Sequence, residues 1–367
     1  MKKLKIATFS MTSVHAAPYI DSIPVNPAFD WVAASISPED RNIPDLKRIP
    51  SYVKIYETEE ELLKSHPDLD VIVLIGSNDQ TYGQFKLCVK HGIKSILMMK
   101  VPSLSMEKYE EMRVLAKEEN VSVLIELEMR KDQTVRRMKE LLDSGVIGKL
   151  LSVQINNTTV VLPPELLPWV TDPGKSYGSV HKLREGDDRY RGGALTDHPH
   201  AFDLVRLFTG SEFESIYADV CENFRDGRQI EEGVFVLGKT KNGVNVNIDP
   251  SYSRHENKKT PIAAVGPGWE GYPKRVEVNI VLNGEKGSIM GDCFHSGVYH
   301  TGLPYNTYAV QYVGGGGTEH YSPILDALVD CTISHTVPYT NIDNHGNNMI
   351  AVNACYESIY TGETIYL

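Results

Sequence analysis

The sequence has few cysteines, and their spacing shows no disulfide or metal-binding pattern. The five cysteines lie far apart, and no two of them form a Cys-x-x-Cys pair. An odd number of widely spaced cysteines is typical of reduced thiols in a cytosol. It argues against a disulfide framework and against a cysteine-based zinc site. We therefore expect a cytoplasmic protein.

The sequence also lacks the features of membrane and nucleic-acid binding. It has no apolar run of roughly 20 residues, the length that a membrane-spanning helix needs. Its basic first residues lead into a short apolar stretch, without the long hydrophobic region or cleavage site of a signal peptide. Lys and Arg form no long run, and the net charge is −11. Membranes and nucleic acids are therefore poor candidates for partners.

The first third of the chain alternates short apolar stretches with helical patterns. With 367 residues, 41% of them hydrophobic, the chain favours two domains over one. Strands are expected at 5–9, 29–35, 53–56, 70–75, 95–98 and 121–125, and helices at 59–65, 81–91 and 106–119. This alternation indicates a parallel, doubly wound sheet, whose ligands lie beyond the carboxyl ends of the strands.

The pattern becomes β-rich in the second part of the chain, after an initial helix at 133–144. Strands are expected at 149–156, 214–220, 233–238, 244–248, 276–282 and 287–290, and closing helices at 321–332 and 344–360. Turns such as Lys241-Asn242-Gly243 indicate antiparallel pairing. We expect an α/β protein with a doubly wound domain at 1–127 and an α+β domain at 128–367. The second domain would hold a large, mainly antiparallel, open sheet, and the closing helices can pack back on the first domain.

The segment Gly192–Arg206, GGALTDHPHAFDLVR, gathers two histidines and two aspartates on an apolar helical pattern. Asp197 stands where the N-cap of a helix is expected, and its carboxylate could accept from first-turn N–H groups. Imidazoles at such a place can move protons or hold a metal ion. The alternative is a capping aspartate beside half-buried histidines that have no chemical role.

Several motifs follow one another in a recognisable order. A nucleotide-fold half precedes DSGVIGKLLSV at 143–153 and GGALTDHPHAFDLVRLFTG at 192–210; ILDALVD at 324–330 and ACYESIYTGETIYL at 354–367 close the chain. In this order the sequence resembles the Gfo/Idh/MocA family, the glucose-fructose oxidoreductase and inositol dehydrogenase group, over nearly its whole length. The resemblance implies a Rossmann domain joined to a mixed α/β domain. It also implies oxidation or reduction of sugars, inositols or polyols with NAD or NADP. The open sheet face would build homodimers or homotetramers.

The nucleotide-binding signals of the family are altered in this sequence. The G-x-G-x-x-G loop is replaced by a stretch without glycine after Phe9, the second strand ends at Ser35 without an acidic residue, and the E-K-P tripeptide reads Met99-Lys100-Val101-Pro102. Glycines in that loop allow a tight turn and close approach to a pyrophosphate. The nucleotide could thus be bound in the family's way, differently, or not at all. The resemblance implies these contacts: Ser10, Met11, Thr12, Ser13, Ser35, Gly76, Ser77, Asn78 and Lys100.

The resemblance assigns catalytic roles to three residues. His200 would be the base that takes the hydroxyl proton of a carbinol, with Lys100 and Asp197 as supporting groups. The spacing between Asp197 and His200 is one residue shorter than the family's D-x-x-x-H. This difference changes the relative direction of the two side chains.

A metal centre is a second interpretation of the same histidines. His15, Asp197, His198 and His200 could converge on a Zn²⁺ or Mn²⁺ ion with an open position for substrate. Such an ion would polarise a keto or hydroxyl oxygen without a nucleotide. The protein would then be a lyase or isomerase for keto-sugars. A non-catalytic, sugar-binding relative is the third alternative.

Other polar and aromatic residues are candidates for contacts with the substrate. Sugars are bound by planar bidentate groups and by aromatic surfaces. Residues of these types stand in the long segment before Gly192 and at the end of a strand in the second domain. The candidates are His181, Arg189, Tyr190, Tyr252 and Arg254.

Overall fold

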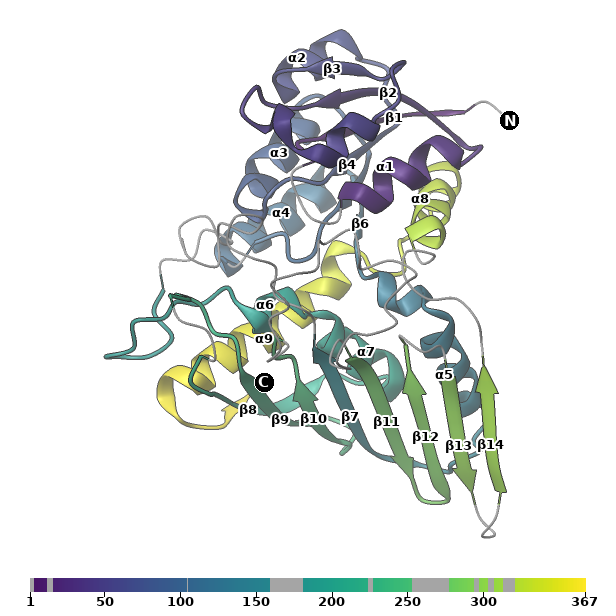
Figure 1. Ribbon diagram of the computed structural model, residues 1–367, viewed down its shortest axis with the longest axis vertical. Coiled ribbons are helices and arrows are strands. Elements are labelled where there is room, and N and C mark those ends of the chain that lie inside the picture. The colour runs from purple at the N-terminus through teal and green to yellow at the C-terminus, as the bar shows by residue number, and fades with distance from the viewer. Residues whose placement is uncertain are drawn as a thin grey trace. The chain divides into compact units, whose positions relative to one another are not determined.

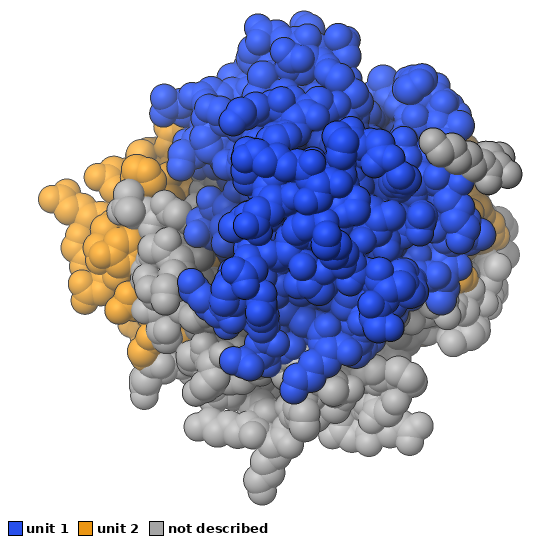
Figure 2. Space-filling view, turned by 90° about the horizontal axis from the view of Figure 1, so that it is seen from above, with its two compact units in different colours: residues 1–128, 175–178, 320–346 blue, residues 129–174, 179–319, 347–367 orange. Residues whose placement is uncertain are grey.

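The contacts of the chain define two compact units, each with its own sheet. Unit 1 comprises residues 1–128, 175–178 and 320–346, and unit 2 comprises residues 129–174, 179–319 and 347–367 (Figure 2). The computed structural model describes residues 3–11, 16–103, 105–158, 181–223, 227–252, 277–293, 297–302, 307–312 and 321–367. Within them, no helix is long and apolar enough to cross a membrane.

Unit 1 is built on a six-stranded parallel sheet in the order β3-β2-β1-β4-β5-β6. The strands are β1 Leu4–Phe9, β2 Phe29–Ser35, β3 Lys54–Tyr56, β4 Val71–Leu74, β5 Ser95–Met98 and β6 Ser122–Ile125. The strand order reverses between β1 and β4, and such a switch point marks the ligand crevice of a doubly wound sheet. The parallel sheet and all six strands are confirmed, each within one residue of its expected bounds.

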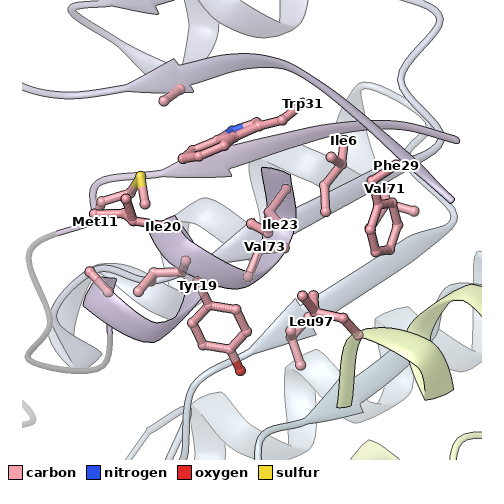
Figure 3. Packing of buried hydrophobic residues seen from close by; sticks show 14 of the residues in the cluster. Ile6, Met11, Tyr19, Ile20, Ile23, Phe29, Trp31, Val71, Val73 and Leu97 are labelled. Atoms are coloured by element: carbon pink, nitrogen blue, oxygen red, sulfur yellow. The ribbon is translucent and has the colours of Figure 1, made fainter. Parts of the chain in front are cut away.

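Helices cover the sheet of unit 1. They are α1 Ala16–Val25, α2 Glu59–Ser65, α3 Asn78–Lys90, α4 Met106–Glu118 and α8 Tyr321–Ser334, with 3₁₀ turns at Asp40–Asn42 and Pro44–Arg48. Helix α1 is absent from the sequence prediction, because prolines in its first and last turns obscure its pattern. Tyr19, Ile20 and Ile23 of this helix belong to the buried cluster that also contains Trp31 and Val73 of the sheet (Figure 3). α8 belongs to the same core and contacts α1, β5 and β6.

Unit 2 is built on a nine-stranded sheet in the order β14-β13-β12-β11-β7-β10-β9-β8-β15 (Figure 1). The strands are β7 Leu150–Thr158, β8 Phe213–Val220, β9 Val234–Thr240, β10 Asn245–Asp249, β11 Glu277–Gly284, β12 Gly287–Asp292, β13 Gly297–Gly302, β14 Thr307–Tyr312 and β15 Ile365–Tyr366. Only β7 and β10 pair in parallel, so the expected mainly antiparallel sheet is confirmed. The short strands β13–β15 are absent from the sequence prediction.

One face of the second sheet packs on helices. These helices are α5 Gln133–Asp143 and α7 His200–Thr209, and a 3₁₀ turn at Glu128–Lys131 precedes α5. Unit 2 also holds α6 Ala194–Asp197 and residues 347–361 of α9 Ile342–Thr361. α5 contacts β12 and β13, and α7 contacts β7 and β10. The packing is tight, since a Cβ at Gly291 would lie 2.2 Å from Sδ of Met138. Among the described residues, the other face exposes three large apolar side chains: Phe235, Leu237 and Met290.

Candidate active-site segments

The carboxyl end of β1 forms a sharp turn without glycine. Ser10 and Met11 have φ angles of 65° and 49°, in the left-handed region that glycine usually occupies. Each such residue costs about 1 kcal/mol or more. The Met11 side chain is fully buried in the core, and the Thr8 hydroxyl donates to its sulfur over 3.1 Å. Packing of the Met11 side chain therefore stabilises this turn. A glycine loop would adopt the same φ angles without such packing.

A polar cluster surrounds the Ser10 hydroxyl. Its Oγ donates to Oε1 of Glu59 over 3.2 Å and accepts from Nε2 of Gln84 over 2.6 Å, and the Gln84 amide also donates to Glu59 over 3.0 Å. A Cβ at Gly76 would lie 2.9 Å from Cβ of Ser10. The side chain at position 10 therefore requires glycine at position 76. Sequence reasoning did not find Glu59 and Gln84, because nothing in their spacing links them to Ser10.

The other expected nucleotide contacts lie at the same edge of the sheet or outside the described residues. Ser35 is buried, and its carbonyl oxygen and Oγ accept from the Ser10 N–H over 3.0 and 3.3 Å. Ser77 precedes α3, and the Asn78 amide donates to the carbonyl of Val101 over 2.8 Å. Thr12 and Ser13, like His15 of the metal hypothesis, lie outside the described residues.

Lys100 lies two residues beyond β5, at the carboxyl edge of the sheet. Its side chain is 6% exposed, and its peptide bond to Val101 is cis. The next strand, β6, leads into Glu126, a buried residue that accepts from the Tyr19 hydroxyl over 3.1 Å. The glycine-like turn, the Gly76–Asn78 segment and Lys100 thus share the edge where a doubly wound sheet binds its ligand. These residues fit a dinucleotide, although β2 supplies no carboxylate for a ribose.

The segment with the two histidines folds differently from the prediction. The expected N-cap role of Asp197 is wrong, because Asp197 is the last residue of the one-turn helix α6. His198 ends that turn, and Pro199 stands at the N-cap of α7, which begins at His200. The helix is interrupted because Pro199 has no N–H to bond to the preceding turn.

A buried carboxyl group caps α6 from outside the segment. Glu231 accepts from the backbone N–H of Gly193 with both carboxyl oxygens over 3.0 Å, and from that of Leu195 over 3.2 Å. The carbonyl of Glu231 accepts from Ala194 N–H over 3.0 Å. Burial raises the pKa of Glu231 to about 7, against the lowering effect of these hydrogen bonds. Glu231 thus takes the capping role that the sequence assigned to Asp197.

A tyrosine of α9 completes this arrangement. The Tyr356 hydroxyl donates to Oε1 of Glu231 over 2.7 Å, accepts from the Gly192 N–H over 3.0 Å and lies 2.5 Å from Oγ1 of Thr196. Burial raises the pKa of Tyr356 well above its usual value, so the phenol stays neutral. α6 and the C-terminal part of α9 consequently lie side by side in unit 2 (Figure 1).

The two histidines are both buried, but their surroundings differ. Nδ1 of His198 lies 2.5 Å from the carbonyl of Pro250, so this nitrogen carries the proton. The ring of His198 also packs edge-on against Tyr252, 5.6 Å away between centroids. His200 opens α7 and is 5% exposed. His198 is therefore fixed by a carbonyl and an aromatic ring, whereas His200 occupies the first position of a helix.

One turn after His200, Asp203 ties three elements together. Arg130 donates to both of its carboxylate oxygens over 2.6 and 2.7 Å, and Asn348 of α9 donates to Oδ1 over 3.1 Å. The Arg206 guanidinium lies farther away, at 3.9 Å. Bidentate arginine–carboxylate pairs are strong and directional. This pair fixes the start of α7, and His200 with it.

The metal hypothesis gains no support from the described residues. Across the described ranges, no group of three or more His, Cys, Asp or Glu side chains could hold a metal ion. Asp197, His198 and His200 therefore form no ligand set among themselves.

The expected substrate contacts are only partly described. Arg189 forms an ion pair with Asp187 over 2.9 Å and donates to the carbonyl of Cys221 over 2.6 Å, so its guanidinium is engaged within unit 2. Nζ of Lys182 lies over the Tyr190 ring, 4.0 Å from its centroid. Tyr252 is buried against His198, and His181 is exposed. Arg254 lies outside the described residues.

Comparisons with known proteins agree with the motifs. Residues 135–290 match the GFO/IDH/MocA C-terminal domain. The myo-inositol 2-dehydrogenase of Thermotoga maritima is 26% identical over 259 residues, which cover 69% of this chain and 65% of that relative. The match therefore spans less than two thirds of the relative's length.

Solved structures of low sequence identity share the fold. An aldose-aldose oxidoreductase from Caulobacter crescentus complexed with glycerol is 18% identical, with a TM-score of 0.78 and full coverage of both chains. An inositol dehydrogenase homolog from Azotobacter vinelandii complexed with NADH and myo-inositol is 13% identical, with a TM-score of 0.77 over 100% of this chain and 98% of that chain. Residues 135–290 therefore match the GFO/IDH/MocA C-terminal domain, and the whole chain shares the fold of these oxidoreductases.

Proposed function

We propose that this protein is an NAD(P)-dependent oxidoreductase that acts on a carbinol group of a sugar, inositol or related polyol. The match to myo-inositol 2-dehydrogenase carries the proposal. The family neighbour that was solved with NADH and myo-inositol supports it. The position of Lys100 at the carboxyl edge of a doubly wound sheet agrees with this activity.

The nucleotide would be held at the edge of the unit 1 sheet. The backbone of Ser10 and Met11 and the segment Gly76–Asn78 would hold it, beside Ser35. Thr12 and Ser13 complete the proposed set. When bound, a nicotinamide nucleotide supplies the hydride exchange with the carbinol carbon. The left-handed turn at Ser10 supports this role, because it keeps the backbone path of a glycine loop.

The chain's own residues would manage the proton. During oxidation, the imidazole of His200 would take the hydroxyl proton of the substrate, and during reduction it would return that proton. The Lys100 ammonium would donate a hydrogen bond to the same oxygen. Asp197 would orient the substrate or the imidazole.

Nucleotide binding and turnover test this proposal. Titration with NAD⁺, NADH, NADP⁺ and NADPH, followed by protein fluorescence and melting temperature, should show saturable binding of at least one pair. Turnover should then appear in a panel of inositols, aldoses and polyols. His200→Ala should lose turnover and keep nucleotide affinity, whereas Lys100→Ala should lose turnover and weaken nucleotide binding. Absence of any response at millimolar nucleotide would refute the proposal.

We also propose that the open face of the unit 2 sheet joins two copies of the chain. Leu237 and Met290, both more than 40% exposed, lie on one cross-strand row of that face, with Asn247, Gln154 and Val281 between them. Exposed apolar side chains on an open sheet face favour association. A Leu237→Asp variant should shift the mass measured by light scattering toward a monomer. The odd number and wide spacing of the five cysteines support a further proposal, that the protein is located in the cytoplasm.

A further inference from the structure

The segment Gly192–Thr196 is held by two residues that no motif of the sequence singled out. Glu231 lies 38 residues after Gly193, and Tyr356 lies 164 residues after Gly192. Both are fully buried, at 0% and 1% exposure. Their oxygens engage the backbone N–H groups of three residues in this segment.

The contact requires glycine at position 193. A Cβ there would lie 2.1 Å from the Glu231 carbonyl oxygen and 2.9 Å from its carboxyl carbon. Because the φ of Gly193 is −95°, the need for glycine comes from space and not from a left-handed conformation. The backbones of positions 193 and 231 thus lie too close together to leave room for a Cβ at position 193.

A second set of bonds continues from Glu231 toward His198. Glu232, the next residue, accepts at its carbonyl from the Tyr252 N–H over 2.8 Å. Tyr252 packs on the His198 ring, and Pro250 accepts the bond from Nδ1 of that ring. The segment 231–232 therefore borders both the start of α6 and the histidine that follows it.

We propose that Glu231 and Tyr356 are positioning residues, a clamp that fixes the one-turn helix α6 and thereby the direction of Asp197, its last residue. The clamp acts on the backbone and touches no reacting atom. A one-turn helix cannot hold its own shape, because its N–H groups have no partners within the turn. Glu231 and Tyr356 supply those partners. For its catalytic consequence, this inference rests on the proposed function.

Two variants remove the clamp with little change of volume. Tyr356→Phe deletes the hydroxyl that the Gly192 N–H and Glu231 share, and Glu231→Gln replaces one acceptor oxygen with a donor. Ser358→Ala is the matched control: it removes a buried hydroxyl from the same helix, one that accepts from Ala218 of β8 over 2.9 Å. Melting curves first establish that all three variants fold.

Hydrogen exchange tests the clamp without any substrate. In Tyr356→Phe the amide of Gly192 should exchange about tenfold faster or more, because its buried acceptor is removed. In Glu231→Gln at least one of the amides of Gly193 and Leu195 should exchange faster by a similar factor, because one carboxyl oxygen becomes a donor. The Ser358→Ala variant should keep the wild-type exchange rate in this segment. Unchanged exchange in folded Tyr356→Phe and Glu231→Gln would overturn the inference.

Kinetics tests the consequence for the reaction. In the clamp variants kcat should fall about tenfold or more, because a small displacement of a catalytic group is costly, while the dissociation constant of the nucleotide stays unchanged. Faster exchange with unaltered kcat would overturn the positioning role. If the wild-type protein turns over no polyol with either nucleotide, the proposed function fails, and the exchange rates alone then decide whether the clamp exists.

Discussion

The turn at Ser10–Met11 in unit 1 and the segment Gly192–Thr196 in unit 2 treat glycine in opposite ways. In unit 1, Ser10 and Met11 adopt left-handed φ angles although they carry side chains, and the absence of a Cβ at Gly76 leaves room for the Ser10 side chain. In unit 2, Gly193 has an ordinary φ but no room for a Cβ beside Glu231. A close neighbouring segment of the backbone, as at Gly193, therefore excludes every side chain, whereas a left-handed φ angle, as at Ser10 and Met11, does not.

The largest effect is expected for Gly193→Ala. The new Cβ would collide with the Glu231 backbone, which cannot move as a flexible side chain could, and we expect a loss of about 4 kcal/mol in unfolding free energy. Gly83→Ala is the matched control, because its Cβ meets nothing within 4 Å inside helix α3. That control should be stabilising by about 0.5–1 kcal/mol. Urea unfolding measures both, and equal effects would contradict the comparison.

The pH dependence of stability should report the burial of Glu231. Its pKa is raised from 4.5 to about 7, so the folded state holds a proton that the unfolded state releases between these values. The stabilisation of the folded state by this proton is therefore fully present below pH 4.5 and is lost as the pH rises through 7. The free energy of unfolding should fall by roughly 3 kcal/mol over this range.

Glu231→Gln isolates this contribution from those of other groups. Because glutamine does not titrate, the difference in unfolding free energy between the wild type and Glu231→Gln should shift against the wild type over that pH range. Urea unfolding at several pH values measures it. A pH-independent difference would show that the buried carboxyl titrates normally.

A smaller effect is expected at the other turn, for Gly76→Ala. Its Cβ would lie 2.9 Å from that of Ser10 and 2.6 Å from Oε1 of Gln80, and the glutamine side chain can move aside. We expect a loss of about 2 kcal/mol. In a Ser10→Gly background most of that loss should disappear, because the two Cβ atoms compete for one space. Additive effects in this double-mutant cycle would show that the Cβ atoms of positions 10 and 76 do not compete for the same space.

The smallest effect is expected for Ser10→Gly alone. The substitution relieves a left-handed residue, a gain of about 1 kcal/mol. It also removes the hydrogen bonds to Glu59 and Gln84, a loss of similar size. The net change in unfolding free energy should stay within about 0.5 kcal/mol. A large loss would show that the polar cluster, and not the backbone, sets the turn.

The elements predicted best are those whose signal is local. Strand β2 and helix α2 have the expected bounds because apolar pattern and the Thr58 cap are written in adjacent residues. Helix α1 was missed because its prolines contradict the local pattern, and α8 supplies packing that overrides it. The cap of α6 was assigned to Asp197, the nearest acidic residue, whereas the chain brings Glu231 from a distant position.

The sequence by itself determined the order of most strands and helices, the parallel and antiparallel character of the two sheets, and the segments that carry Lys100 and His200. These follow from periodicity and motif order, which depend on near neighbours along the chain. Only the tertiary structure decided what holds those segments. The Glu59–Gln84 cluster around Ser10 and the Glu231–Tyr356 clamp join residues tens to more than a hundred positions apart. Such contacts leave no periodic trace, because any distant residue of suitable size and polarity could make them.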